Sequence, residues 1–196
     1  MLNFAQNMRS AWLYKFALII VVLAGTSCKD LNQLISFNLE TRDRVSVPPF
    51  PDSLLTDTLL GNEMMMIVTD PIYFGNYKKF ETNKSLPENV EDVEAIDLIV
   101  RIDSGSFDFS FANNYSFYLS PSGQFFDDVE LASIVNPEPG RVSLTFKMKP
   151  KNAEWLKIIR GNKYHLRMDY TMVKGLKKPV HLLFEMRFRL KSMPVK

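Results

Sequence analysis

The C-terminal third of the chain alternates apolar and polar side chains in three long runs. These runs are residues 142–148, 163–172 and 180–191. Alternation with a period of two sends successive side chains to opposite faces of a strand. Each run therefore predicts a strand with one buried and one solvated face, and strands of this kind need a second layer to cover the buried face.

The same alternation, or a short apolar run, predicts further strands upstream. They cover residues 35–47, 63–68, 94–103, 116–120 and 127–135, with Pro and Gly between them. A short helix is predicted over residues 152–159, with Asn152 as its N-cap and Gly161 as its left-handed C-cap. Short, punctuated strands are typical of an all-β fold, and we expect an antiparallel β-sandwich with one short helix.

Cys28 is the single cysteine and stands at the end of a signal-like segment. Arg9 and Lys15 precede an apolar run at residues 16–24, and small residues occupy positions 25–27. This order predicts a lipoprotein signal peptide over residues 1–27, with a covalent lipid on Cys28. An anchor helix or a buried core helix is the alternative. Gly25 departs from the strongest lipoprotein sequences, which have Leu at that position.

Lys29 and Asp30 follow the cysteine and resemble an export signal that directs lipoproteins to the outer leaflet of the outer membrane. A plain charged start to a flexible tether is the alternative. We expect a lipid-anchored tether over residues 28–34 and one β-sandwich domain over residues 35–192. The predicted location is the outer membrane, at the cell surface rather than on the periplasmic face.

Charge is distributed unevenly along the chain. The net charge of +2 comes from Arg9 and Lys15, so removing the signal peptide leaves a formally neutral chain and no argument for nucleic-acid binding. Residues 29–140 hold 7 Lys and Arg against 19 Asp and Glu, whereas residues 141–196 hold 15 against 3. Opposite charges of this size help two parts of a chain to pack, or expose one acidic and one basic surface.

The order of these features resembles a group of uncharacterised surface lipoproteins from Bacteroidota. The resemblance rests on a strand ending in proline at residues 37–48, a central strand at 95–102, the Ser106-Phe107-Asp108-Phe109-Ser110-Phe111 segment leading into 115–120, and two C-terminal strands. It implies an outer-membrane lipoprotein with a β-sandwich domain. It implies no substrate and no active-site residues.

Two three-residue motifs in the Pro-rich loop resemble acceptor sites for O-glycosylation of exported Bacteroidota proteins. They are Asp52-Ser53-Leu54 and Asp57-Thr58-Leu59, in which Ser53 and Thr58 would carry the sugar. Such a site needs an exposed, extended segment.

Nothing in the sequence predicts an enzyme or a metal site. No His-Glu-x-x-His, Gly-x-Ser-x-Gly or phosphate-binding Gly-rich loop is present, and the chain has only two histidines. The carboxylate clusters at residues 91–94 and 127–130 lack the ligand spacing of a calcium loop, so solvated turns account for them better. We therefore expect no cofactor beyond the lipid on Cys28.

The aromatic run at residues 107–126 has two interpretations. Exposed rings would form a sugar-binding platform, whereas the period-two spacing favours rings in the sandwich core.

The last three predicted strands, if paired side by side, would share one basic face. Its residues would be Lys147, Lys149, Lys163, His165, Arg167, His181, Arg187, Arg189 and Lys191. Lipopolysaccharide phosphates, an acidic glycan or an acidic partner protein would bind such a face. The alternative is a solvated face neutralised by the acidic part of the same chain.

Two functional hypotheses follow. The first is a non-enzymatic surface lipoprotein that acts as an interaction module or accessory subunit of an envelope complex. The second is a carbohydrate-binding, nutrient-capture lipoprotein beside an outer-membrane transporter, which needs exposed aromatic rings.

Overall fold

The computed structural model describes residues 34–55, 64–74, 78–103, 107–149 and 152–195. The predicted signal peptide, the lipidation site Cys28 and most of the tether lie outside the described residues. Within the described residues, no helix is both long and apolar enough to cross a membrane.

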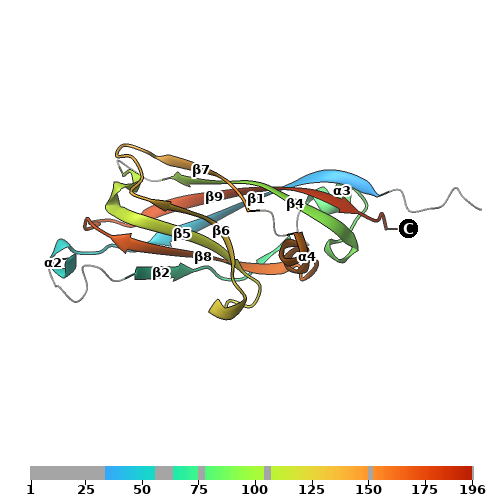
Figure 1. The fold of residues 1–196 in the computed structure, drawn as a ribbon, viewed down its shortest axis with the longest axis horizontal. Helices are drawn as coiled ribbons and strands as arrows, with labels where there is room; N and C mark the ends of the chain where they lie inside the picture. The colour runs from blue at the N-terminus through green and yellow to red at the C-terminus, as the bar shows by residue number, and fades with distance from the viewer. Residues whose placement is uncertain (1–33, 56–63, 75–77, 104–106, 150–151, 196) are drawn as a thin grey trace, which may run out of the picture. The chain divides into compact units, whose positions relative to one another are not determined.

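Strands from both ends of the chain build the first sheet (Figure 1). In spatial order its described strands are β1 (Ile35–Val47), β9 (Val180–Ser192), β4 (Val90–Ile102) and β7 (Ser143–Lys147). Every pairing is antiparallel. The C-terminal strand β9 therefore lies inside the sheet, between the first strand and the central strand.

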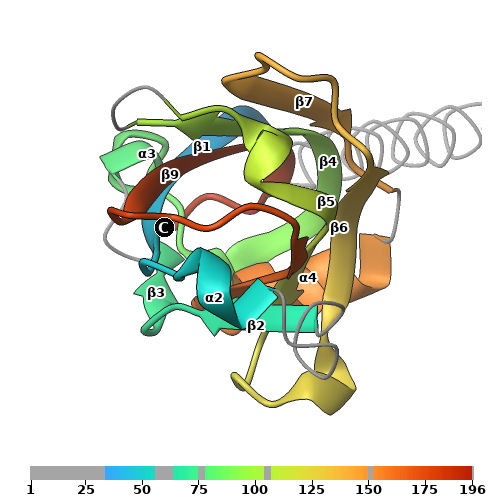
Figure 2. The same cartoon turned by 90° about the vertical axis from the view of Figure 1, so that its left-hand side faces the viewer.

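The second sheet packs against the first and completes the sandwich, as the end-on view in Figure 2 shows. In spatial order its described strands are β2 (Met64–Val68), β8 (Lys163–Met172), β5 (Ala112–Ser120) and β6 (Val129–Val135), and the two-residue β3 (Ile72–Tyr73) also pairs with β8. The predicted antiparallel β-sandwich is confirmed.

The described part of the chain contains more helix than we predicted. The helix α4 (Asn152–Arg160) confirms the prediction, but α3 (Lys78–Thr82) and the single turn α2 (Asp52–Leu55) were not predicted, and short 3-10 turns occupy Pro87–Asn89, Phe109–Phe111 and Phe125–Asp127. Helix α3 has one buried residue, Phe80, whose ring meets Phe37 edge-on at 5.5 Å between centroids. A single apolar anchor produces no sequence period, so the pattern did not reveal this helix.

The end of α4 differs from the predicted cap. Gly161 has no positive φ, and the left-handed residue is Asn162, with φ 55°. Asparagine tolerates this conformation because its short polar side chain bonds locally. The helix packs against the sheet through Trp155, which is fully buried and meets Phe188 at 5.6 Å between ring centroids.

The three C-terminal strands do not pair with one another, so the basis of the predicted basic face is wrong. β7 pairs with β4, β8 belongs to the second sheet, and β9 pairs with β1 and β4. Alternation identifies the buried face of a strand but contains no information about its neighbours, because pairing depends on chain crossings between the sheets.

Candidate functional site

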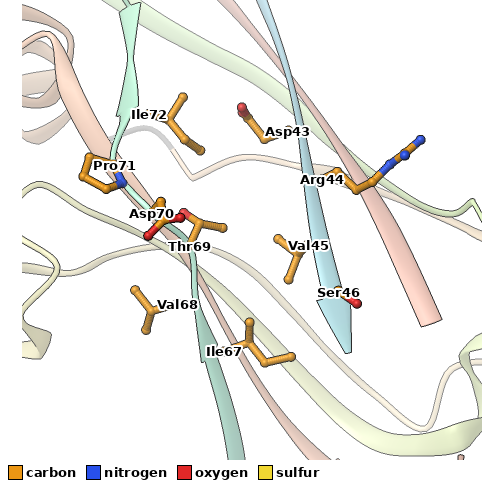
Figure 3. A pocket seen from close by; sticks show the side chains of 10 residues that line it. All are labelled: Asp43, Arg44, Val45, Ser46, Ile67, Val68, Thr69, Asp70, Pro71 and Ile72. Atoms are coloured by element: carbon orange, nitrogen blue, oxygen red, sulfur yellow. The ribbon is translucent and has the colours of Figure 1, made fainter. Parts of the chain in front are cut away.

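A cleft of about 430 Å³ opens along one side of the sandwich, between β1 and the β2–β3 segment (Figure 3). Residues 43–46 of β1 line one wall, and residues 67–72 line the other. β1 and β2 stand at the ends of their respective sheets, and each has one strand neighbour among the described strands. The cleft is therefore bordered by two sheet edges, where backbone N–H and C=O groups lack a ladder partner.

Asp43 is the least exposed of the polar side chains on the β1 wall of the cleft. It belongs to the inward row of β1, which comprises Phe37, Leu39, Thr41, Asp43, Val45 and Val47. Its carboxylate accepts a hydrogen bond of 2.7 Å from the Tyr164 hydroxyl of β8, so the contact crosses between the sheets. Burial raises the pKa of Asp43 above its ordinary value of 3.8, and the hydrogen bond from Tyr164 only partly opposes this.

Thr69 belongs to the opposite wall of the cleft and attaches that wall to β8 by hydrogen bonds. Its N–H donates to Leu166 O and its Oγ1 accepts from Leu166 N, both at 2.9 Å. Its carbonyl oxygen lies 2.8 Å from His165 Nδ1, so that nitrogen carries the proton in this contact. The backbone of the wall is thus fixed before any ligand arrives.

The cleft is acidic because its cationic side chain turns outward. Figure 3 shows Arg44 pointing away from the β2–β3 wall, and its guanidinium pairs with Asp103. Asp43 and Asp70 remain as the charged groups among the other residues that line the cleft.

The sequence analysis missed Asp43, although its signal was present. The alternation noted for Phe37 and Leu39 continues to Asp43, which places a carboxylate on the apolar side of the strand. An ionisable residue at an inward position costs desolvation, so it marks a candidate site.

The predicted basic face is replaced by a ladder of ion pairs on the outer side of the first sheet. Arg187 pairs with Asp97, Arg189 with Glu94 at 2.8 Å, and Lys191 with Asp92 at 3.0 Å. Arg187, Arg189 and Lys191 of β9 thus each meet a carboxylate of β4. The opposite charges of the two parts of the chain are used in packing, as the alternative interpretation expected.

The other residues of the predicted face are divided between the sheets. Lys147 lies at the edge strand β7, and His181 is on β9. Lys149 pairs with Glu130 at 2.8 Å, while Lys163, His165 and Arg167 belong to β8 in the second sheet. The nine residues therefore do not lie on a single sheet.

Arg167 is the centre of a largely buried charge cluster on the outer side of β8. Its guanidinium donates to Asp169 at 2.9 and 2.5 Å and also pairs with Asp128. It lies 4.3 Å from the centroid of the Tyr118 ring. The hydrogen bonds from Arg167 to Asp169 raise the pKa of the guanidinium further, so it stays charged.

The aromatic run is split between the two interpretations. Phe109, Phe111 and Phe117 are buried, and the first two meet the Tyr115 ring edge-on at 5.6 Å. Phe126 is instead 82% exposed. The side chain of Phe125 lies outside the described residues.

Both carboxylate clusters make ion pairs or hydrogen bonds, and the first lies on β4 rather than in a turn, with side chains that are still 40–61% exposed. Glu91 pairs with Arg160 at 3.3 Å, and the Asp127 carboxylate accepts a hydrogen bond of 2.9 Å from the Ser122 hydroxyl. Within the described ranges, no group of three or more His, Cys, Asp or Glu side chains is arranged to hold a metal ion.

The predicted glycosylation segment is only partly described. Ser53 is exposed but belongs to the helical turn α2, so the expected extended conformation is not found there. Its neighbour Asp52 accepts a hydrogen bond of 2.7 Å from the N–H of Gly175. Thr58 lies outside the described residues, as do Cys28, Lys29 and Asp30.

Fold and site define the described domain as a two-sheet antiparallel β-sandwich with a side cleft. No protein-family model matches the chain, and no curated protein sequence matches it.

Solved structures of similar architecture are distant. A mud crab tombus-like virus structure matches with 12% identity and a TM-score of 0.32, covering 89% of this chain and 98% of that chain. A Macrobrachium rosenbergii nodavirus particle matches with 9% identity and a TM-score of 0.37, covering 85% of this chain and 87% of that chain. The family 32 CBM of Clostridium perfringens NanJ, in complex with galactose, matches with 12% identity and a TM-score of 0.31, covering 76% of this chain and 99% of that chain. Likenesses this weak carry no argument about ligand or partner.

Proposed function

We propose that this chain is a non-enzymatic interaction module of the cell envelope, and that its side cleft accepts an extended, basic segment of a protein partner. The observation that carries the proposal is the position of Asp43 in a cleft bordered by two sheet edges. An extended segment adds to a sheet edge through main-chain hydrogen bonds, while its alternate side chains enter neighbouring pockets.

Charge supports a basic segment. Asp43 has lost part of its hydration, and the hydrogen bond that it accepts comes from a neutral hydroxyl, that of Tyr164. A Lys or Arg side chain from the partner would compensate the carboxylate, and Asp70 adds a second negative charge to the lining of the cleft. Lipopolysaccharide and acidic glycans are disfavoured as ligands here, because their charge has the same sign as these carboxylates.

Location is a separate part of the proposal and is supported by sequence. The signal-like segment ending at Cys28 and the resemblance to Bacteroidota lipoproteins support a lipid anchor in the outer membrane, and Lys29 and Asp30 support the cell surface. We expect a Cys28→Ala variant to leave the membrane fraction after a high-salt wash. Full retention of that variant would refute the lipid anchor.

The cleft is tested by site-specific photocrosslinking of the full chain in its own cells. Ser46 is exposed and lines the cleft, so a photoreactive residue there should give one discrete crosslinked product. The same residue at Lys147, an exposed position on the edge strand β7, is the matched control and should not give that product.

Charge dependence makes this test specific. Asp43→Asn in the Ser46 crosslinking protein should lower the yield about tenfold, because the partner's cation would lose its counter-charge. Glu138→Gln removes an exposed carboxylate that pairs with Arg141 and does not line the cleft, so it should leave the yield unchanged. The proposal would be contradicted by equal yields of the crosslinked product from positions 46 and 147. It would also be contradicted if Asp43→Asn left the yield from position 46 unchanged.

A further inference from the structure

The loop between β5 and β6 is anchored at several points. The N–H of Gly123 donates to Ser120 Oγ and that of Gln124 to Ser122 Oγ, both at 3.0 Å. Ser122 Oγ in turn donates to Asp127 at 2.9 Å. Gly123, with φ 75°, lies so close to the His165 ring that an added Cβ would be 3.1 Å from it. The loop is thus held against the outer side of β8.

This anchored loop carries a large aromatic ring in solvent. Phe126 is 82% exposed, while Phe109 and Phe117 of the same aromatic run are fully buried. A cavity of about 230 Å³ lies beside it, between the loop and α4. An exposed ring next to a cavity, on a loop that is already ordered, is arranged to meet a ligand at low entropic cost.

Polar groups of both signs line the same cavity. Asp127, Asp128 and Glu154 contribute carboxylates, and Lys157 contributes an ammonium group. The Asp128 side chain is only 5% exposed. One of its oxygens pairs with Arg167, whereas the other, Oδ1, is buried without a hydrogen-bond partner in the described part of the chain. A buried acceptor of this kind is normally satisfied by a donor, and Asp128 is itself a lining residue of the cavity.

The mixture of groups selects the class of ligand. The carboxylates oppose an anion, while Arg167 already neutralises Asp128 and Lys157 adds a further positive charge, so little excess negative charge is left to attract a cation. A neutral polyhydroxylated ring satisfies both, since its hydroxyls donate to carboxylates and accept from an ammonium group, while its C–H face packs on an aromatic ring. A cavity below the usual range of about 300–1,000 Å³ suits one sugar ring rather than a longer ligand.

We propose that the cavity between the β5–β6 loop and α4 binds one ring of a neutral saccharide, with Phe126 as the stacking platform. This site is separate from the proposed partner cleft, because the two share no lining residue. Failure of one proposal therefore leaves the other standing.

The test is saturation-transfer difference NMR with the full chain and a panel of neutral methyl glycosides of galactose, glucose, mannose and N-acetylglucosamine. At least one glycoside should bind, with transfer strongest at the C–H protons of one ring face. Phe126→Ala should weaken its binding about tenfold or more. Tyr73→Ala removes another exposed aromatic ring, one that does not line the cavity, and should leave affinity within about twofold.

Two further probes test the ligand class, choline as a cation and glucuronate as an anion. Both should bind more weakly than the best neutral glycoside. The proposal is overturned if no neutral glycoside binds, if choline or glucuronate binds more tightly, or if Phe126→Ala and Tyr73→Ala have equal effects. Because Phe126 is almost wholly exposed, its replacement should leave the thermal unfolding midpoint unchanged, so a loss of binding reports the site.

Discussion

Arg167→Met should be among the most damaging single substitutions on the outer side of the second sheet. The side chain of Arg167 is 14% exposed, and its partners Asp128 and Asp169 are 5% and 6% exposed. Removing the guanidinium leaves two carboxylates in a poorly hydrated cluster with no cation between them. The magnitude therefore follows from desolvation rather than from the strength of the lost ion pairs.

A cost of about 3–5 kcal/mol is expected, the range for removing one partner of a buried pair. Arg189→Met is the matched control, because Arg189 and Glu94 are 51% and 61% exposed. An exposed pair contributes about 0–1 kcal/mol. The same substitution should thus differ several-fold in cost between the two sheets.

Urea unfolding measures both variants, with stability taken from the shift in midpoint at constant m value. A triple variant, Arg167→Met with Asp128→Leu and Asp169→Leu, should recover most of the loss, because no buried charge is then left unpaired. If Arg167→Met costs no more than Arg189→Met, or if the triple variant is the least stable of all, the reasoning from burial is refuted.

Three other substitutions are predicted. Asp43→Asn should raise stability at neutral pH, because burial raises the pKa of Asp43 above 3.8. The contribution of Asp43 is fully present below that unfolded value and is lost as pH rises through the raised folded value, so the advantage of the variant should vanish in acid; urea midpoints across pH check this. Gly123→Ala should cost at least about 1–2 kcal/mol in chemical unfolding, since φ is 75° and the new Cβ would press on His165. Trp155→Ala should cost about 3–5 kcal/mol because the indole is fully buried, and a small fall in the thermal midpoint would contradict this.

Strand positions were largely readable from sequence. The predicted strands over residues 35–47 and 163–172 agree with β1 and β8 at both ends, and the last strand differs from β9 by one residue at its C-terminal end. Alternation works here because one face of each strand is buried, and a slip of one residue would reverse every side chain. The predicted strand over residues 94–103 misses the first four residues of the 13-residue strand β4. Acidic side chains dominate this part of the strand, and some of them pair with cations across the sheet.

The candidate sites were less predictable. Phe126 and Phe117 have the same residue type in the same aromatic run, but one is exposed on a loop and the other is buried on β5. The alternation in β1 predicts an inward position for Asp43, but it does not predict the partner of Asp43, because Tyr164 lies 121 residues away. A contact at that separation depends on how the sheets face each other, which no local pattern records.

By itself, the sequence determined most of the strand segments, the buried face of each, and the signal-like context of Cys28, while β3 and the first residues of β5 were not predicted. These are local properties, set by side-chain polarity at spacings of a few residues. The tertiary structure alone decided which strands are neighbours. By placing β9 between β1 and β4, it converted an apparent basic surface into a ladder of ion pairs, and it left the β1 and β2 edges to border the cleft. The physical reason is that pairing and charge neutralisation depend on distances between residues far apart in the chain, which exist only once both sheets have formed.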